Sequence, residues 1–244
     1  MSYQRYRPTD MPPVVKNLII INVIVFIAQL VLDKHYDVTN KIGLWPYGAE
    51  PFKPYQIVTS MFAHSPALIF HIVFNMFVLY SFGRVLEMVW KEKRFLFFYL
   101  ASGIGAALVH LLVIYLKYGD MSQYGFEFLG DGTVQSSYAA FVNNQDKFEA
   151  TVKALAPAVG ASGAIMGIMA AFAYLFPNTE LYIMFIPMPV KAKWAILGYV
   201  VIDLFGGFYQ IPGDNIAHFA HLGGALTGFL LVLYWNKTNR KTLY

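Results

Sequence analysis

Four polar side chains stand out in an otherwise apolar sequence because their types suit acyl transfer to a serine. Ser162 lies in the segment Gly160–Gly163, and its hydroxyl becomes a nucleophile when a base removes its proton. His221 offers an imidazole, which is the most common base for this step. His71 and Asn75 are four residues apart, so a helix would place both on one face as hydrogen-bond donors. These residue types together predict a serine hydrolase site with Ser162 as nucleophile and His221 as base.

The oxyanion that forms during acyl transfer also needs hydrogen-bond donors. Pro157 and Gly160 are poor helix residues, so we expect the helix that carries the serine to begin near Ala161. The first amides of a helix have no carbonyl partner within it and attract negative charge. We therefore predict three oxyanion donors, two side chains and one backbone amide: His71, Asn75 and Gly163.

Glycines on two segments would let the helix of the serine approach the helix of the histidine. Gly224 and Gly228 follow His221 at three and seven residues, which places all three on one helical stripe. Gly224 and Gly228 form the small-residue pattern of tightly packed membrane helices, and Gly163 with Gly167 forms a second one. We expect the two helices to pack closely through these glycines, whereas alanine would hold them apart.

Other polar residues in these segments allow alternative interpretations. His218 lies one turn before His221, but only His221 has the glycine spacing, which favours His221 as the base. The two histidines could instead form a metal pair, although the sequence indicates no third ligand at matching depth. Asp203 could be a triad acid, but its position before Leu-Phe-Gly-Gly favours a hydrogen bond at a helix end or in a loop. A single membrane serine is most often structural, because its hydroxyl bonds its own helix backbone, so the prediction depends on the combination.

The composition indicates a protein that crosses a membrane several times. Hydrophobic residues make up 57% of the 244 residues, charged residues make up 13%, and the mean hydropathy is +0.50. These values lie far outside the range of soluble domains. The sequence has no cysteine, which excludes disulfides and thiolate metal sites. The net charge of +4 comes without a long basic run, so nucleic-acid binding is not indicated, and no cofactor or metal is expected.

Six apolar segments are long enough for membrane-spanning helices, which need about 20 apolar residues. They cover residues 14–32, 67–90, 95–116, 154–176, 190–208 and 216–235. The predicted fold is therefore all-α, a polytopic membrane protein with a bundle of six transmembrane helices. We expect one membrane domain over residues 14–235, a polar loop or insertion over residues 117–151, and tails at residues 1–13 and 236–244.

The basic residues predict how these helices are oriented. Twelve of the 18 Lys and Arg residues fall on one side of the predicted membrane: Arg5, Arg7, Lys16, Arg84, Lys91, Lys93, Arg94, Lys191, Lys193, Lys237, Arg240 and Lys241. The positive-inside rule then places both termini in the cytoplasm, and the second, fourth and sixth spans run from outside to inside. The candidate site residues lie near the outer ends of these three spans. We expect a multi-pass protein of the plasma or inner cell membrane with a site that opens to the extracytoplasmic side.

The candidate residues lie in three motifs that resemble those of the rhomboid family of intramembrane serine proteases. The family's G-x-S-G matches Gly160–Gly163, its H-x-x-x-N matches His71–Asn75, and its A-H-x-x-G-x-x-x-G matches Ala220–Gly228. The motifs occur in the family's order, and the resemblance covers nearly the whole chain except residues 117–151. One departure is Met166, where family members often carry an aromatic residue that stacks on the catalytic imidazole. A thioether also packs against a ring edge, so we expect Met166 to be tolerated beside the site.

The resemblance implies a six-helix rhomboid-like bundle with a Ser–His dyad, Ser162 and His221, and no third acid. It also implies cleavage of other membrane proteins within or near a transmembrane segment, so the expected partners are transmembrane protein substrates and membrane lipid. An inactive rhomboid-like chaperone or binding protein is one alternative, but its usual sign, loss of the serine or the histidine, does not occur here. A small transporter is another, and it predicts repeated halves and a charged midplane site that the sequence lacks.

Overall fold

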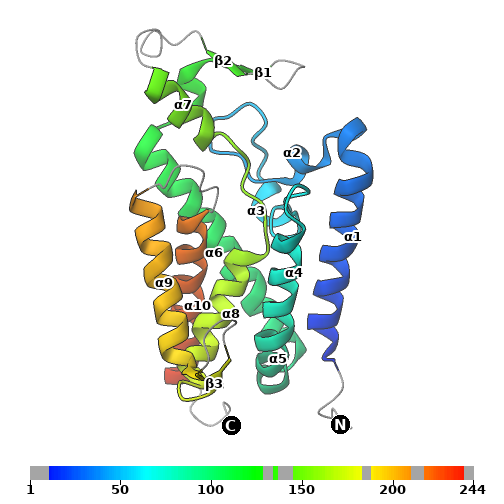
Figure 1. Ribbon diagram of the computed structural model, residues 1–244, viewed down its shortest axis with the longest axis vertical. Helices are drawn as coiled ribbons and strands as arrows, with labels where there is room; N and C mark the ends of the chain where they lie inside the picture. The colour runs from blue at the N-terminus through cyan, green and yellow to red at the C-terminus, as the bar shows by residue number, and fades with distance from the viewer. Residues whose placement is uncertain (1–10, 129–133, 137–144, 183–187, 210–216, 239–244) are drawn as a thin grey trace.

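The computed structural model describes residues 11–128, 134–136, 145–182, 188–209 and 217–238, and it shows a bundle of helices (Figure 1). The long helical segments are α1 (Pro13–Tyr36), α4 (Ile69–Val78) continued by the π-helical turn η1 (Leu79–Gly83) and α5 (Arg84–Trp90), α6 (Glu92–Tyr118), α8 (Ser162–Leu175), α9 (Ala192–Tyr209) and α10 (His218–Thr238). The short helices are α2 (Val38–Ile42), α3 (Gln56–Thr59), η2 (Met121–Tyr124) and α7 (Gln145–Ala154). Two antiparallel strand pairs complete the described chain: β1 (Phe126–Phe128) with β2 (Val134–Ser136), and β3 (Glu180–Leu181) with β4 (Val190–Lys191).

Each of the six predicted spans coincides with a long helical segment of the described chain, so the predicted all-α membrane bundle is confirmed. Among the described residues, four segments are long and apolar enough to cross a membrane by length and composition: Pro13–Tyr36, Ile69–Trp90, Glu92–Tyr118 and His218–Thr238. Helix α8 is apolar but has only 14 residues. The fourth predicted span starts at residue 154, whereas α8 begins at Ser162, because Pro157 and Gly160 do not continue a helix.

The chain that leads into α8 is held by backbone hydrogen bonds. The amide of Leu44 donates to the carbonyl of Ala158, and the amide of Ala158 donates to the carbonyl of Leu44, both at 2.9 Å. The amide of Gly160 donates to the carbonyl of Ser60 at 3.0 Å. Gly160 has φ = +136°, a conformation that residues with a side chain rarely adopt. This turn brings the chain to Ser162 at the start of α8.

The helices run in the alternating directions that six consecutive spans require. Helix α1 begins and α10 ends at the same end of the bundle, and α4–α5, α8 and α10 all run toward that end (Figure 1). We call it the basic end, because Lys16, Lys91, Lys193 and Lys237 lie at the ends of α1, α5, α9 and α10 there. The common direction of α4–α5, α8 and α10 agrees with the prediction that the second, fourth and sixth spans run in the same direction.

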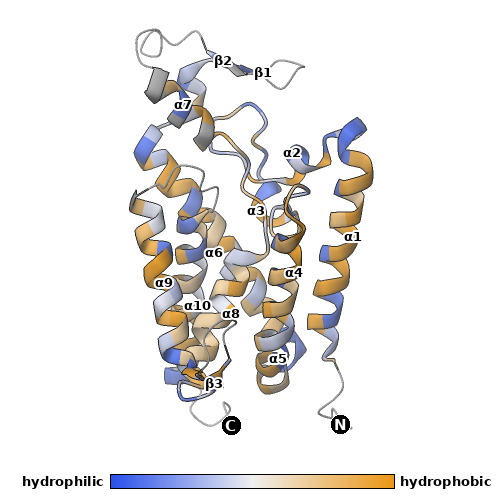
Figure 2. Ribbon diagram, in the orientation of Figure 1, coloured by the Kyte–Doolittle hydropathy of each residue, from blue (hydrophilic) through white to orange (hydrophobic). Residues whose placement is uncertain are grey.

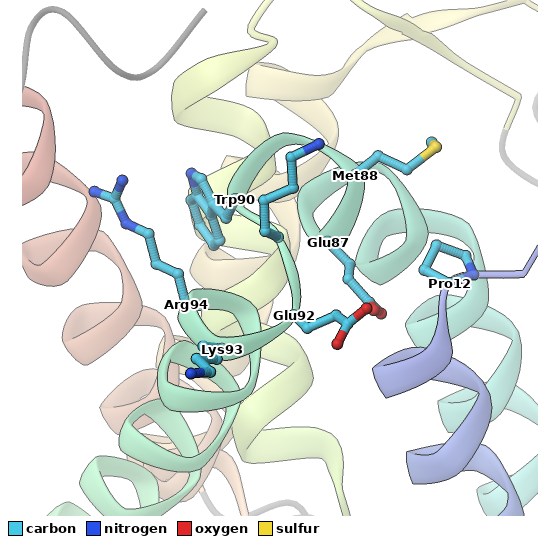
Figure 3. A pocket seen from close by; sticks show the side chains of 8 residues that line it. Pro12, Glu87, Met88, Trp90, Glu92, Lys93 and Arg94 are labelled. Carbon is cyan, nitrogen blue, oxygen red and sulfur yellow. The ribbon is translucent and has the colours of Figure 1, made fainter. Parts of the chain in front are cut away.

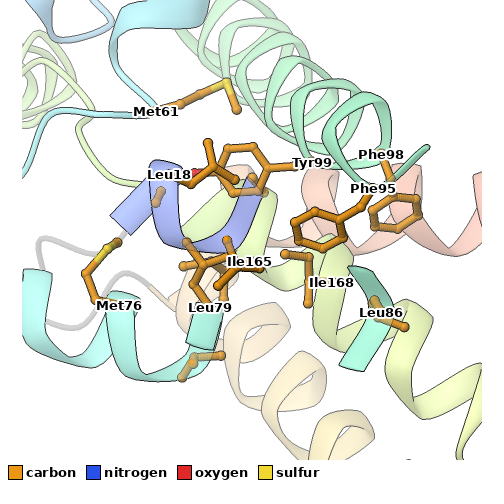
Figure 4. Packing of buried hydrophobic residues seen from close by; sticks show 14 of the residues in the cluster. Leu18, Met61, Met76, Leu79, Leu86, Phe95, Phe98, Tyr99, Ile165 and Ile168 are labelled. Carbon is orange, nitrogen blue, oxygen red and sulfur yellow. The ribbon is translucent and has the colours of Figure 1, made fainter. Parts of the chain in front are cut away.

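A hydrophobic core holds α1, α4–α5, α6 and α8 together (Figure 4). Leu18, Leu79, Phe95, Tyr99 and Ile168 are among its buried members. The outer faces of the helices are also apolar, as the orange ribbons of Figure 2 show. The exposed apolar side chains include Ile24 at 60%, Val31 at 65%, Phe70 at 75% and Phe77 at 64%. Apolar surface on this scale suits the hydrocarbon of a bilayer and not water.

The region predicted as a polar loop contains regular structure in its described parts. Helix α6 extends to Tyr118, and η2, the β1–β2 pair and α7 follow. A second, smaller hydrophobic cluster anchors this region to the chain before α3: Trp45, Ala49, Met121, Tyr124 and Leu155. The apolar residues scattered through the segment therefore have a packing role that its polar composition obscured.

At the basic end, a buried carboxylate joins the second span to the first. The two carboxylate oxygens of Glu87 accept the backbone amides of Val14 at 2.9 Å and Val15 at 2.7 Å. These amides lie in the first turn of α1, where intrahelical partners are lacking. Glu87, Pro12 and neighbouring residues of α5 and α6 also line a pocket at this end (Figure 3). The lining of that pocket includes none of the candidate site residues.

Candidate active site

Ser162 and His221 lie within hydrogen-bond distance although 59 residues separate them in the chain. The Oγ atom of Ser162, at the start of α8, is 2.8 Å from Nε2 of His221, in the first turn of α10. His221 is buried, with 7% of its surface exposed, and Ser162 is half-buried. A hydroxyl at this distance can pass its proton to Nε2 when that nitrogen carries none, which makes Oγ a nucleophile.

A third polar group, the carboxylate of Asp203 in α9, contacts both histidines of α10. Nδ1 of His221 lies 3.1 Å from Oδ2 and 3.2 Å from Oδ1 of Asp203, and Nδ1 of His218 lies 2.7 Å from Oδ1. The expected hydrogen bond at a helix end or in a loop is therefore wrong, since Asp203 lies within α9 and is 3% exposed. The resemblance implied a dyad without a third acid, and this carboxylate nevertheless lies in contact with His221. The expected position of Asp203 was wrong because the packing of α9 against α10 turns it toward the histidines.

The contacts of the two histidines do not form a metal pair. His218 and His221 both direct Nδ1 to the same carboxylate, and Nε2 of His221 meets Ser162. Within the described ranges, no group of three or more histidine and acidic side chains is arranged to hold a metal ion.

His71 of α4 borders the space beside Ser162. A Cβ atom built on Gly160 would lie 3.0 Å from Nε2 of His71 and 3.3 Å from Oγ of Ser162, so both atoms face the position of Gly160. Nδ1 of His71 accepts the backbone amide of Ser65 at 3.4 Å, which leaves the proton of the neutral ring on Nε2. His71 therefore presents an N–H group to the site, as an oxyanion donor must.

Asn75 and Gly163 have different surroundings from His71. The side-chain amide of Asn75 donates to the carbonyl of His71 at 2.7 Å, so this hydrogen bond lies within α4 and does not reach Ser162. The same nitrogen carries a second N–H group. The amide of Gly163 lies in the first turn of α8, ahead of the bond from Ile165 to the carbonyl of Ala161 at 3.0 Å. It is thus one of the amides at a helix start that lack an intrahelical acceptor.

Paired glycines bring the backbones of α8 and α10 into contact. A Cβ atom on Gly224 would overlap the carbonyl oxygen of Gly163. One on Gly228 would lie 2.5 Å from Cα and 2.7 Å from the carbonyl oxygen of Gly167. Since the two helices touch backbone to backbone, this contact sets the distance between the first turns that carry Ser162 and His221.

An aromatic ring lies beside His221, but it comes from α9 and not from the position of Met166. Met166 is buried in α8, with 2% of its surface exposed. The ring of Tyr199 lies 6.4 Å from the His221 ring, centroid to centroid, with an interplanar angle of 30°. Tyr199 and Asp203 are four residues apart and share one face of α9. The sequence analysis did not predict that Tyr199 and Asp203 contact His221. Their spacing of four residues within an apolar span is the sequence feature that could have indicated a polar face directed into the protein.

Polar side chains of α1 anchor the backbone just before α4. Gln29 donates from Nε2 to the carbonyl of His64 at 2.8 Å and accepts the amide of His64 at 2.9 Å. Nε2 of His64 lies 2.9 Å from Oδ1 of Asn22, whose own amide donates to the backbone of α1, so His64 is the donor. Asn22, Gln29 and His64 are all fully buried. They hold the segment whose next residue, Ser65, contacts His71.

Comparison with known proteins finds relatives along most of the chain. It is 27% identical over 212 residues to Rhomboid protein 1, mitochondrial, of Saccharomyces cerevisiae, covering 87% of this chain and 46% of that protein. It is 29% identical over 217 residues to RHOMBOID-like protein 12, mitochondrial, of Arabidopsis thaliana, covering 87% and 55%. It is 29% identical over 180 residues to Presenilin-associated rhomboid-like protein, mitochondrial, of Homo sapiens, covering 73% and 37%. The chain therefore spans about half the length, or less, of these curated relatives.

These relatives correct the location expected from the sequence. The expected plasma or inner cell membrane, with cytoplasmic termini, is contradicted because all three relatives are named as mitochondrial proteins. The error has a physical reason. The distribution of Lys and Arg indicates which loops share one side of a membrane, and it does not identify the membrane.

A protein-family model matches most of the chain. The Rhomboid domain matches residues 51–237. This range includes Ser162, His221, His71 and Asn75, and it covers α4–α5, α6, α8, α9 and all but the last residue of α10. Because the model covers well over half of the sequence and includes the segments that form the site, this chain belongs to the rhomboid family.

Proposed function

We propose that this chain is an intramembrane serine endopeptidase of a mitochondrial membrane, which cleaves transmembrane segments of other membrane proteins with Ser162 and His221. The observation that carries the proposal is the 2.8 Å distance between Oγ of Ser162 and Nε2 of His221 within a rhomboid-family membrane bundle. The apolar outer faces of α1 and α4 support membrane-embedded substrates and a lipid environment. The names of the relatives support the mitochondrial location.

Acylation begins when Nε2 of His221 takes the hydroxyl proton of Ser162. Oγ then forms a bond to the carbonyl carbon of the substrate peptide, and the carbonyl oxygen becomes an oxyanion. In this proposal Nε2 of His71 and the amide of Gly163 donate to the oxyanion, and Asn75 is a further donor through its second N–H; the position of His71 Nε2 beside Gly160 supports its role. The imidazolium of His221 returns the proton to the amide nitrogen as the C–N bond breaks, and an acyl-enzyme remains.

Deacylation repeats these steps with water in place of the serine. His221 takes one proton from water, and the water oxygen bonds to the acyl carbon. When the bond between this carbon and Oγ breaks, the proton passes from His221 back to Ser162. The imidazole and the hydroxyl are restored, and the products carry one new carboxyl and one new amino terminus.

The proposal is tested with purified full-length protein in detergent and in liposomes. We expect a fluorophosphonate probe to label Ser162, identified by peptide mass spectrometry, and a model transmembrane substrate to be cleaved. Ser162→Ala should abolish labelling and cleavage, and His221→Ala should reduce both to background, because Oγ then lacks its base. Ser81→Ala and His35→Ala are matched controls that should keep full activity, since the Ser81 hydroxyl bonds its own helix and His35 is exposed.

Two results would contradict the proposal. The first is wild-type protein that stays folded yet neither reacts with the probe nor cleaves the substrate, which would favour an inactive protein that only binds membrane helices. The second is cleavage that survives Ser162→Ala, which would require another nucleophile.

A further inference from the structure

We propose that Asp203 is a positioning residue for His221, held in place by His218, so that the site works as a Ser162–His221–Asp203 triad. This inference rests on the proposed function and deepens it, because a dyad without an acid is what the family resemblance implied. It assigns a role to a carboxylate that otherwise lies buried in an apolar span without a function. It also gives His218 a role other than that of base.

The geometry of the three helices supports this role. Helix α8 carries Ser162, α10 carries both histidines, and α9 brings the carboxylate to them. Oδ2 of Asp203 lies 3.1 Å from Nδ1 of His221, while Nε2 on the opposite side of the same ring lies 2.8 Å from Oγ of Ser162. The ring is therefore held from both sides along one line of polar contacts.

The carboxylate fixes which nitrogen of His221 carries the proton. An ionised carboxylate only accepts hydrogen bonds, so Nδ1 of His221 must donate to it. The neutral ring then has an unprotonated Nε2, which is the atom that must take the proton of Ser162. Without Asp203 the ring is free to adopt the other tautomer, with an N–H directed at Oγ, and that form cannot act as a base.

Asp203 also counters the charge that forms during the reaction. When His221 takes the serine proton, it becomes an imidazolium in a buried site. A charge in an apolar environment is costly unless an opposite charge is close, and Asp203 supplies one in direct contact. The stabilisation grows as the positive charge develops, so it should appear in kcat and leave KM nearly unchanged.

His218 gives the carboxylate of Asp203 a second histidine partner. Its Nδ1 donates to Oδ1 of Asp203 at 2.7 Å, the shortest of the contacts that this carboxylate makes to the two histidines. Gly206, three residues after Asp203 on the same helix, makes room for the ring, since a Cβ atom there would overlap His218. The face of α9 is thus shaped to receive His218, and the carboxylate has a donor on each side.

Asp203→Asn tests the inference, because it keeps the shape of the side chain and removes the charge. We expect kcat for the model substrate to fall by about 10²–10⁴-fold, in line with the loss seen when the acid of a serine triad becomes an amide. KM should stay within about twofold and the midpoint of thermal unfolding should be kept, because the amide still fills the site. Asp203→Glu should recover part of the rate, since it restores the charge. Asp120→Asn is the matched control at an exposed carboxylate, and it should leave kcat unchanged.

A second measurement reports the tautomer without turnover. In protein with ¹⁵N-labelled histidine, the His221 signal, identified by its loss in His221→Ala, should show a proton on Nδ1 and none on Nε2. Asp203→Asn should remove this preference. His218→Gln should lower kcat less than Asp203→Asn does, because it loosens the carboxylate and leaves it present.

The outcomes separate this inference from the proposed function. If the wild type cleaves the substrate and Asp203→Asn has the same kcat and the same His221 tautomer as the wild type, the positioning role is wrong and the proposed protease function is unaffected. A loss of kcat that Asp203→Glu does not recover, with a lower unfolding midpoint, would show a purely structural role and also overturn the inference. If the wild type has no activity while the His221 tautomer depends on Asp203, the proposed protease function is wrong, and the result supports only the part of the inference in which Asp203 orients the His221 ring.

Discussion

Gly224 of α10 lies directly against the carbonyl of Gly163 in α8, so closely that a Cβ atom on Gly224 would overlap that oxygen. The contact is one helical turn from His221 and one residue from Ser162. Any side chain at this position must push the two helices apart near the place where imidazole and hydroxyl meet. Helix separation and the chemistry of the site are therefore linked through one pair of glycines.

Gly224→Val should reduce both stability and activity. The added side chain overpacks the contact between α8 and α10, at a cost of about 1–3 kcal/mol in the free energy of unfolding. Separation of the helices also lengthens the distance from Ser162 to His221, so labelling by the fluorophosphonate should slow. Thermal unfolding in detergent and the labelling rate measure the two effects. Gly198→Ala is the matched control, because a Cβ atom there meets nothing within 4 Å and should be neutral or mildly stabilising.

Gly160→Ala should inactivate the protein for a different reason. Its φ of +136° is strained for any residue with a side chain, at a cost of about 1–3 kcal/mol. The new Cβ atom would also press on Nε2 of His71 and Oγ of Ser162. Gly119→Ala separates the two effects, since Gly119 also has a positive φ, +77°, but its neighbour is the flexible side chain of Gln123. Equal activity losses in the two variants would show that strain alone matters.

Asn75→Ala should slow cleavage by about 10²–10³-fold if its second N–H reaches the oxyanion. The loss should appear in kcat, because the ground-state carbonyl needs this donor less than the transition state does. Steady-state kinetics with the model substrate measure it, and Asn178→Ala, at an exposed position, is the control. A kcat within threefold of the wild type would limit Asn75 to its bond with the His71 carbonyl.

Gln29→Leu should weaken the support of His71 from a distance. The change leaves the buried amide and carbonyl of His64 without partners, and each unpaired group costs about 1–3 kcal/mol. The unfolding midpoint should fall, and kcat should fall with it as the backbone that donates to His71 loosens. Gln123→Leu is the matched control, because the side chain of Gln123 is exposed and its bond to Tyr118 can be replaced by water. Equal midpoints for the two variants would refute an anchoring role for Gln29.

The sequence was sufficient for the features that depend on neighbouring residues. Each long apolar run became a helix because a backbone in lipid must satisfy its own hydrogen bonds. Pro157 and Gly160 placed the start of α8 at Ser162, close to the expected Ala161. The spacing of His71 and Asn75, and the spacing of Gly224 and Gly228, likewise put each pair on one helical face.

The partners of Asp203 and Tyr199 could not be predicted in this way. Tyr199 and Asp203 mark one polar face of α9, but which residues of α10 meet that face depends on how the two helices rotate and pack, and the sequence of α9 alone does not contain this information. The ordered parts of the 117–151 region escaped prediction for a related reason, since their few apolar residues gain a role only against Trp45 and Ala49 of a distant segment. Helical periodicity is a property of adjacent residues, whereas the contact between Asp203 and His221 depends on the relative placement of two helices, and packing across the whole bundle sets that placement.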